Sequence, residues 1–204
     1  MSHPTGAAAK QASDPVAIEV RPMRPEEAEA VGTLTLASYD AYGSMVGPYR
    51  DFLADPMIRA SGCTALLVAE LDGSPVGTVT FVLPGDTEWE GRAELDGDAG
   101  FRVLAVAPGA EGRGVGRALV EACLTQARER GCRRVSITSM SWMYRAHELY
   151  LGLGFTRRPD LDVRFPGGDG VAFTLDLTAD ADRHFPAPGP VPDAPPWFED
   201  AWDG

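Results

Sequence analysis

The amino-acid sequence predicts a single α/β domain in which a mixed, strongly twisted β-sheet is flanked by helices. Two local patterns carry this prediction. Two β-like runs meet at an Asp-Gly turn within residues 64–84, and a β-like run at 101–107 leads through a glycine-rich turn into an amphipathic helix. A chain of 204 residues, 44% hydrophobic and 24% charged, is large enough for one such domain with terminal tails.

The first part of the domain is predicted to be a strand, a helical region and a hairpin. Residues 17–23 form the strand, and Pro25 opens a helix that extends through Tyr42. Residues 49–60 form a second helical region with a weaker period. The hairpin at 64–84 follows, because Asp-Gly is a strong turn signal between two strand-like runs.

The middle of the domain is predicted to contain a mobile loop, a buried strand and an anion-binding turn. The polar stretch 84–100 has Trp89 as its only aromatic residue, which favours the loop. The aliphatic run 101–107 suits a buried strand, and the glycines that follow let the chain turn tightly against a ligand. The next helix has one apolar stripe, formed by Val115, Ala118, Leu119 and Ala122. Its N-terminal amides therefore stay open to a phosphate.

Two familiar phosphate-binding motifs do not fit this turn. A Walker loop that begins at Gly109 would need Lys and then Ser or Thr after Gly114, but Val115 and Gly116 follow instead. A dinucleotide fingerprint needs another glycine spacing and an acidic ribose ligand at the end of the next strand, where this chain has Ser139. The turn is therefore expected to bind a pyrophosphate in another way.

The turn and a later helix resemble the two signatures of the GNAT superfamily of N-acetyltransferases. Residues 111–116, EGRGVG, resemble Q/R-x-x-G-x-G/A, with Glu111 where Gln or Arg is usual. Residues 143–155, MYRAHELYLGLGF, resemble N-x-x-A-x-x-L-Y-x-x-L-G-F, with Met143 in place of the usual Asn. The matching positions of this second motif are Ala146, Leu149, Tyr150, Leu153, Gly154 and Phe155. The resemblance covers about residues 17–178.

The resemblance implies a GNAT-type domain that uses acetyl-CoA as co-substrate and no metal. Its sheet would be splayed between the strands at 101–107 and 133–139 to admit the pantetheine arm, and a last strand would follow at 171–177. A bulge in the first of these strands would aim the backbone N–H of Leu104 at the thioester oxygen, and the backbone of Val106 would pair with pantetheine. The pyrophosphate would lie on Gly112, Arg113, Gly114, Val115, Gly116 and Arg117.

The resemblance also suggests catalytic side chains. Tyr150 is predicted to be the general acid that protonates the departing thiolate, and the alternative is a tyrosine that only packs in the core. Some relatives use a glutamate four residues before the bulge donor as a base, but Gly100 occupies that position here. Asp98, acting through a water relay, is the remaining candidate, with Glu94 or Asp96 as further acids.

These features predict an N-acetyltransferase in which a primary amine attacks the thioester of acetyl-CoA directly. The acceptor is expected to be a small amine or an amine of a peptide or protein. The alternative is a non-catalytic regulatory module that binds acetyl-CoA, because the departures at Glu111 and Gly100 are also those of a degenerate family member. A homodimer is expected, as in many relatives.

Two segments near the expected acceptor site have two interpretations each. In the family, the helices near the N-terminus border this site, so their aromatic residues either form its walls or pack in the core; they are Tyr39, Tyr42, Tyr49 and Phe52. The loop at 84–100 either meets a cationic substrate through Trp89 and its acids or is a solvated acidic loop. The acids are Glu88, Glu90, Glu94, Asp96 and Asp98.

Composition excludes several other classes of protein. The formal net charge of −12 argues against nucleic-acid binding and favours a cationic acceptor. No apolar stretch approaches the ~20 residues that span a bilayer, and the N-terminus lacks the apolar core of a signal peptide, so a cytoplasmic protein without membrane contact is expected. The cysteines lack CxxC spacing and the histidines do not cluster, which predicts reduced thiols and no metal site.

Both ends of the chain are predicted to be tails around a catalytic domain at 17–178. Residues 1–16 are small and polar, which favours flexibility. Residues 179–204 combine prolines and acids with large aromatic residues, namely Phe185, Trp197, Phe198 and Trp202. Free tails seldom carry so much apolar surface, so this end is expected to dock onto the domain or a partner subunit.

Overall fold

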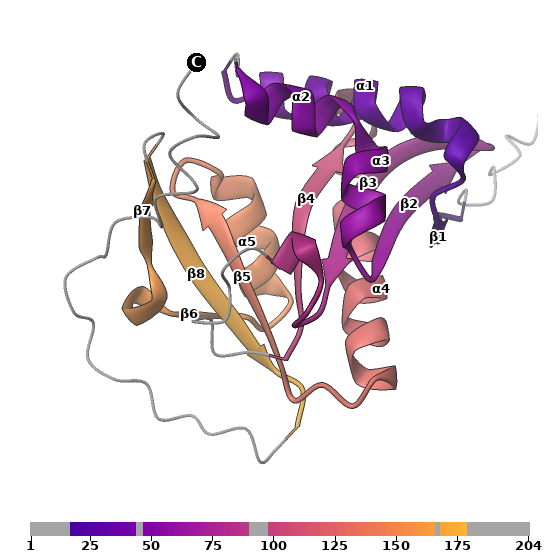
Figure 1. Cartoon of the computed structure of the whole chain (residues 1–204). Coiled ribbons are helices and arrows are strands. Elements are labelled where there is room, and N and C mark those ends of the chain that lie inside the picture. Colours follow the sequence, from indigo (N-terminus) through magenta and orange to yellow (C-terminus); the bar gives the residue numbers. More distant parts are fainter. Residues whose placement is uncertain (1–16, 44–46, 90–97, 166–167, 179–204) are drawn as a thin grey trace, which may run out of the picture.

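The computed structural model describes most of the predicted domain (Figure 1). The described residues are 17–43, 47–89, 98–165 and 168–178. The predicted tails lie outside them, as do the loop acids Glu90, Glu94 and Asp96. Within these stretches, no helix combines the length and the apolar character that crossing a membrane requires.

The first sheet is antiparallel and contains the predicted hairpin. Its strands in spatial order are β1 (Glu19–Pro22), β2 (Ala65–Leu71), β3 (Ser74–Val82) and β4 (Gly100–Val106). The turn between β2 and β3 has positive φ at both Asp72 (50°) and Gly73 (77°), as a type I′ turn requires. The hairpin prediction is therefore confirmed, and so are the strands expected on either side of it.

The second sheet comes from the C-terminal part of the domain. Its strands are β5 (Arg134–Met140), β6 (Thr156–Arg157), β7 (Val163–Phe165) and β8 (Gly168–Asp176). β8 pairs antiparallel with all three others. β5 and β8 correspond to the two strands expected from the sequence, whereas β6 and β7 are too short to leave a periodic pattern.

The two sheets meet at one end and then separate. Ala99 forms an isolated parallel bridge with Val135, and the Ser136 N–H donates to the Ala99 carbonyl at 2.9 Å. The Asp98 N–H donates to the Arg134 carbonyl at 3.0 Å. Beyond this point, within the described residues, β4 pairs with β3 and β5 pairs with β8, so the two strands diverge (Figure 1). The splay expected between these strands is present.

Helices cover both faces of the first sheet (Figure 1). One face carries α1 (Ala28–Asp40), α2 (Pro48–Ala54) and α3 (Pro56–Gly62); the other carries α4 (Val115–Glu129); and α5 (Tyr144–Gly152) lies beside the second sheet. The region expected to be one helix at 49–60 is two helices, because Pro56 begins α3 and the Asp55 carboxylate caps it by accepting from the Met57 N–H at 2.9 Å.

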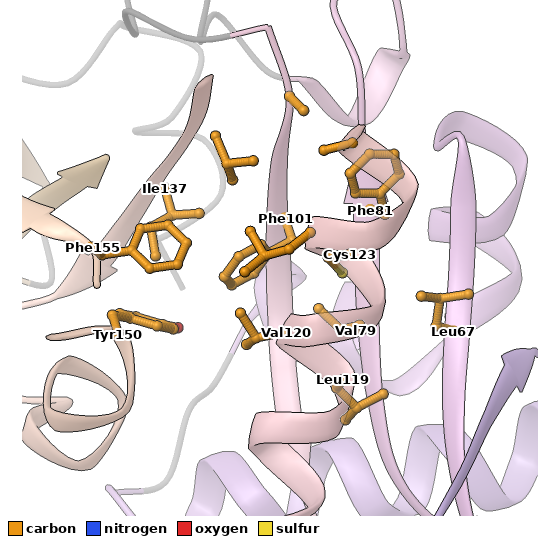
Figure 2. Packing of buried hydrophobic residues seen from close by; sticks show 14 of the residues in the cluster. Leu67, Val79, Phe81, Phe101, Leu119, Val120, Cys123, Ile137, Tyr150 and Phe155 are labelled. Carbon is orange, nitrogen blue, oxygen red and sulfur yellow. The ribbon is translucent and has the colours of Figure 1, made fainter. Parts of the chain in front are cut away.

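Each face of the first sheet has its own hydrophobic core. α4 packs through Leu119, Val120 and Cys123 against β2, β3 and β4, and this core continues through Phe101 to α5 and β5. Figure 2 shows Phe155 and Tyr150 facing Phe101 across the junction of the two sheets. On the opposite face a smaller core joins α1 and α2 to the sheet; it consists of Val31, Leu34, Tyr39, Leu53, Val68, Val103 and Ala105. The two cores therefore fix α4 on one side of β4 and α1 on the other, and both helices border the site.

The expected mobile loop at 84–100 is ordered at its start, which corrects the prediction for Glu88 and Trp89. Both residues lie in a short 3-10 helix at Thr87–Trp89, and each is only 6% exposed. The Asp86 carboxylate fixes this turn by accepting hydrogen bonds from the Leu83 N–H and from both the N–H and the hydroxyl of Thr64. Trp89 is therefore a core residue and not a wall of an open substrate site.

Candidate active site

Strand β4 has a bulge at the position predicted for it. Its pairing with β3 skips from Ala105 opposite Thr78 to Arg102 opposite Thr80, so two residues of β4 face one residue of β3. Val103, the first residue of the bulge, has a φ of 49°, in the left-handed region that a β-branched side chain rarely adopts. A bulge turns backbone groups away from the ladder, and Leu104 is the second residue of this bulge. The proposed donor role of the Leu104 N–H stays a prediction.

The glycine turn before α4 leaves the N-terminus of that helix open. Gly112 and Gly114 have φ values of 72° and 88°, which favour glycine. Gly114 is the N-cap of α4, and no side chain in the described part of the chain caps the helix there. A Cβ built on Gly112 would meet no atom within 4 Å, so the turn borders open space. Free amides and the positive end of the helix dipole therefore face this space.

A cavity of about 690 Å³ lies between β4, the glycine turn, α4, α5 and α1. Seven of the residues predicted to bind the co-substrate line it, namely Leu104, Val106, Gly112, Gly114, Val115, Gly116 and Arg117. Arg113, also predicted, is exposed and lies outside the lining. Within the described chain, no group of three or more His, Cys, Asp or Glu side chains could hold a metal ion.

Helix α1 and the residues just after it contribute a further wall of the cavity. Tyr39 and Tyr42 line it, as one of their two interpretations predicted, whereas Tyr49 and Phe52 do not belong to this lining. Ser38 also lines it, and its hydroxyl accepts a hydrogen bond from the Val106 N–H at 3.3 Å. Sequence reasoning missed Ser38, because no local pattern indicates that α1 reaches the edge of β4.

The charges at the cavity mouth explain how the unusual Glu111 is accommodated. The Arg145 guanidinium donates to the Glu111 carboxylate at 2.6 Å, which joins the glycine turn to the start of α5. Both side chains line the cavity and both are exposed, at 72% for Arg145 and 42% for Glu111. Arg117 lines it as well and lies 3.4 Å from Glu121, one turn further along α4. The ion pair balances the charge that Glu111 adds to the mouth.

Tyr150 lies deep in the junction of the two sheets and is 5% exposed. Its ring packs against those of Phe101 and Phe173, with centroids 5.8 and 5.7 Å away. It follows Leu149, which lines the cavity, and its hydroxyl end points to the side of Phe101 and Val120 in Figure 2. The phenol is close enough to Tyr39 to influence it electrostatically. The general-acid role stays a prediction.

Asp98 lies at the closed end of the splay, away from the cavity lining. Its carboxylate accepts from the Arg133 guanidinium at 3.0 Å and from the Arg133 N–H at 2.8 Å. These hydrogen bonds hold the pKa of the Asp98 carboxyl below its usual value, and this outweighs the opposite effect of partial burial. The structure thus brings Asp98 together with Arg133 and not with Leu104 or Tyr150.

The sequence model of the acetyltransferase (GNAT) family matches residues 25–155. The fold is similar to that of a GNAT family acetyltransferase from Staphylococcus aureus Mu50, with 15% identity, a TM-score of 0.62 and coverage of 79% of this chain and 100% of that chain. It is also similar to a GNAT family acetyltransferase from Brucella melitensis in complex with acetyl-CoA, with 21% identity, a TM-score of 0.53 and coverage of 81% and 92%.

A third similar structure is the ribosomal-protein-S18-alanine N-acetyltransferase from Escherichia coli, with 16% identity, a TM-score of 0.57 and coverage of 83% of this chain and 99% of that chain. At such low identities the structures show a shared fold. No curated protein matches the sequence.

Proposed function

Because the chain belongs to the acetyltransferase (GNAT) family, we propose that it transfers the acetyl group of acetyl-CoA to a primary amine of a small molecule, peptide or protein. The chain is an acyltransferase, and acetyl-CoA is its co-substrate. One observation supports the proposal more than any other. The uncapped helix N-terminus, the glycine turn and the bulged strand β4 all border the same cavity.

The residues around the cavity fit the diphosphate and the pantetheine arm of acetyl-CoA. The amides of the glycine turn and of the first turn of α4 would hold the diphosphate, with Arg117 and Arg145 as the nearby cations. The backbone of Val106 lies at the edge of β4 that the splay leaves without a partner strand, where the amide groups of pantetheine would pair with it. Acetyl-CoA supplies an activated thioester.

Acetyl transfer forms one bond and breaks another. The amine nitrogen attacks the thioester carbonyl carbon, the C–N bond forms and the C–S bond breaks, which gives an N-acetyl amide and the coenzyme A thiol. The nitrogen loses one proton and the sulfur gains one. The backbone N–H of Leu104 would donate to the carbonyl oxygen as negative charge grows on it. Asp98 has no role in this proposal, because Arg133 holds its carboxylate at the closed end of the splay.

Replacing Tyr150 with phenylalanine is expected to lower kcat about 10- to 100-fold, because the phenol would protonate the departing sulfur. The ring would keep its aromatic packing, so the free energy of unfolding should change little. Tyr144→Phe on the same helix is the matched control, since Tyr144 is 67% exposed. Turnover is measured by thiol release from about pH 6 to 9. Equal turnover of Tyr150→Phe and the wild type across this range would leave Tyr150 with a packing role alone.

Replacing Glu111 with glutamine is expected to strengthen coenzyme A binding roughly threefold to tenfold. The change removes a negative charge beside the diphosphate and releases Arg145 from its ion pair. The gain should shrink at high salt, because both side chains are exposed. Calorimetric titration with coenzyme A measures it, and Glu129→Gln at the far end of α4 is the control. Weaker binding by Glu111→Gln would mean that the ion pair holds the site together.

The proposed function is tested by incubating the purified chain with acetyl-CoA and a panel of amines. Free thiol above the amine-free background, with an added acetyl mass on the acceptor, is the expected result. Tight coenzyme A binding without thiol release from any amine would favour the alternative, a regulatory module that binds acetyl-CoA. Absence of coenzyme A binding would contradict both.

A further inference from the structure

Two arginines are buried side by side beneath α2 and α3, next to the candidate active site. Arg59 of α3 is 0% exposed and Arg102 of β4 is 9% exposed. Both guanidinium groups lie over the same ring, with the Cζ atoms of Arg59 and Arg102 at 5.7 and 5.0 Å from the centroid of Phe52. Two like charges are thus held close together away from solvent, and burial, with a smaller effect of the Arg102 charge, lowers the pKa of the Arg59 guanidinium.

One edge of the Arg59 guanidinium has no hydrogen-bond partner among the described residues. Its Nη1 donates to the carbonyls of Phe52 and Leu53, at 2.8 and 3.0 Å, and so provides hydrogen bonds to carbonyl groups at the C-terminal end of α2. Its Nε and Nη2 are buried and form no hydrogen bond with any of the described residues. These two nitrogens form the edge of a guanidinium whose parallel N–H groups match the two oxygens of a carboxylate. A helix cap explains Nη1 but leaves this edge unexplained.

Glu88, a carboxylate that attracts Arg59, is already engaged with Arg102. Glu88 lies 3.1 Å from Arg102 in a buried ion pair, with exposures of 8% and 7% for the two side chains. Glu88 attracts Arg59 electrostatically but forms no hydrogen bond with it. A guanidinium keeps its charge. Leaving two N–H groups of a buried charged side chain without acceptors destabilises the folded protein. The edge is therefore suited to an anion that the described residues do not supply.

Tyr39 links the arginine cluster to the cavity. Tyr39 lines the cavity and packs in the same core as Tyr49 and Phe52. Burial raises the pKa of Tyr39 well above its usual value, Tyr49 and Tyr150 raise it further, and Arg102 and Arg59 act in the opposite direction, which places both arginines near this phenol. Arg102 also precedes Leu104 by two residues on β4.

We propose that the acceptor amine carries a carboxylate and that Arg59 binds it through its Nε and Nη2 edge, with Arg102 as a second cation. This inference rests on the proposed function, because it concerns the acceptor of the acetyl group. Tyr49 and Phe52, half-buried and stacked at 5.7 Å, cover the cluster from α2, so the carboxylate enters when these rings turn aside. The local charge of the site, and not the net charge of −12, selects the acceptor.

The first test uses the unaltered protein and matched pairs of acceptors. Each pair consists of an amino acid and its carboxamide, which differ in the negative charge alone, and the spacer between amine and carboxylate varies from pair to pair. At least one pair should show kcat/KM higher for the carboxylate by ~30-fold or more. If kcat/KM is the same for the amide and the acid in every pair, the inference is overturned while the proposed function stays intact. Phosphate-bearing amines preferred over carboxylates would overturn it as well.

The second test assigns the preference to Arg59. Arg59→Gln should reduce the ratio of acid to amide kcat/KM to about one, mainly through KM for the acid. Arg59→Lys should restore only part of it, because an ammonium lacks the paired N–H edge. Arg128→Gln, an exposed position on α4, is the control with the same charge change. Coenzyme A binding and the free energy of unfolding are measured for each variant.

Two outcomes of the second test contradict the inference. In one, Arg59→Gln lowers kcat/KM for acids and amides alike, which is the result of a purely structural cap on α2. In the other, the preference for the acid survives in Arg59→Gln. If no amine of any kind releases thiol while coenzyme A binds, the proposed function fails first, and the two failures are thus distinguishable.

Discussion

Replacing Gly114 with aspartate is expected to weaken coenzyme A binding about 30-fold more than replacing it with asparagine. Gly114 has a φ of 88°, so both side chains strain the turn to a similar extent. Aspartate adds a negative charge at the N-cap of α4, where the diphosphate is proposed to bind. Like charges a few ångströms apart in a partly solvated site repel by about 2 kcal/mol, and this repulsion separates the two variants.

Calorimetric titration with coenzyme A at low and high salt measures this difference. The difference in coenzyme A affinity between Gly114→Asp and Gly114→Asn should decrease as salt screens the charges. The same pair of substitutions at Gly109 is the control, because Gly109 lies outside the cavity lining and a Cβ there meets nothing within 4 Å. Equal affinities of Gly114→Asp and Gly114→Asn would place the diphosphate away from this turn and contradict the proposed binding mode.

Replacing Gly32 with alanine is expected to lower the free energy of unfolding by about 2 to 4 kcal/mol. Gly32 lies in α1, and a Cβ there would come within 2.0 Å of the Ala54 carbonyl oxygen at the end of α2. Backbone atoms cannot rotate away as a side chain can, so α2 would have to shift. The same change in an isolated helix would stabilise it by about 1 kcal/mol. Tertiary packing therefore reverses the sign of the effect.

Urea unfolding of the two proteins measures this loss. Gly152→Ala in α5 is the matched control, since the nearest atom to its Cβ would be the Arg117 Nη2 at an ordinary 3.7 Å. That variant should be as stable as the wild type or gain up to about 1 kcal/mol. Wild-type stability of Gly32→Ala would show that α2 packs against α1 less closely than in this structure. Because α2 covers Arg59, Gly32→Ala should also disturb the acceptor side of the site.

The elements that the sequence predicted correctly are those whose signal is local. Asp72 and Gly73 specify a two-residue turn through their own backbone preferences, so the hairpin follows from a few neighbouring residues. Gly112 and Gly114 adopt positive φ in the structure, and the stripe of α4 repeats with the helical period. Most of the predicted co-substrate residues therefore line one cavity, because they share one strand, one turn and one helix start.

The residues that sequence reasoning misjudged or missed depend on contacts between distant segments. Glu88 appears in the sequence as one acid of a polar loop, and only its meeting with Arg102 reveals a buried ion pair. Arg145 has no local sign that it will balance Glu111, 34 residues away. Asp98 looked available as a base, but the start of β5 brings Arg133 to its carboxylate.

The sequence by itself determined the order of the longer strands and of α1, α4 and α5, the hairpin, the glycine turn and the family, because backbone preferences and hydrophobic periods act over a few residues. Only the tertiary structure decided which charges meet, at which residues the two sheets touch and which edge of Arg59 has no partner among the described residues. Coulomb attraction and desolvation depend on distance in space and not on distance along the chain, so the chemistry of the acceptor site became visible only once α2, α3 and β4 were placed together.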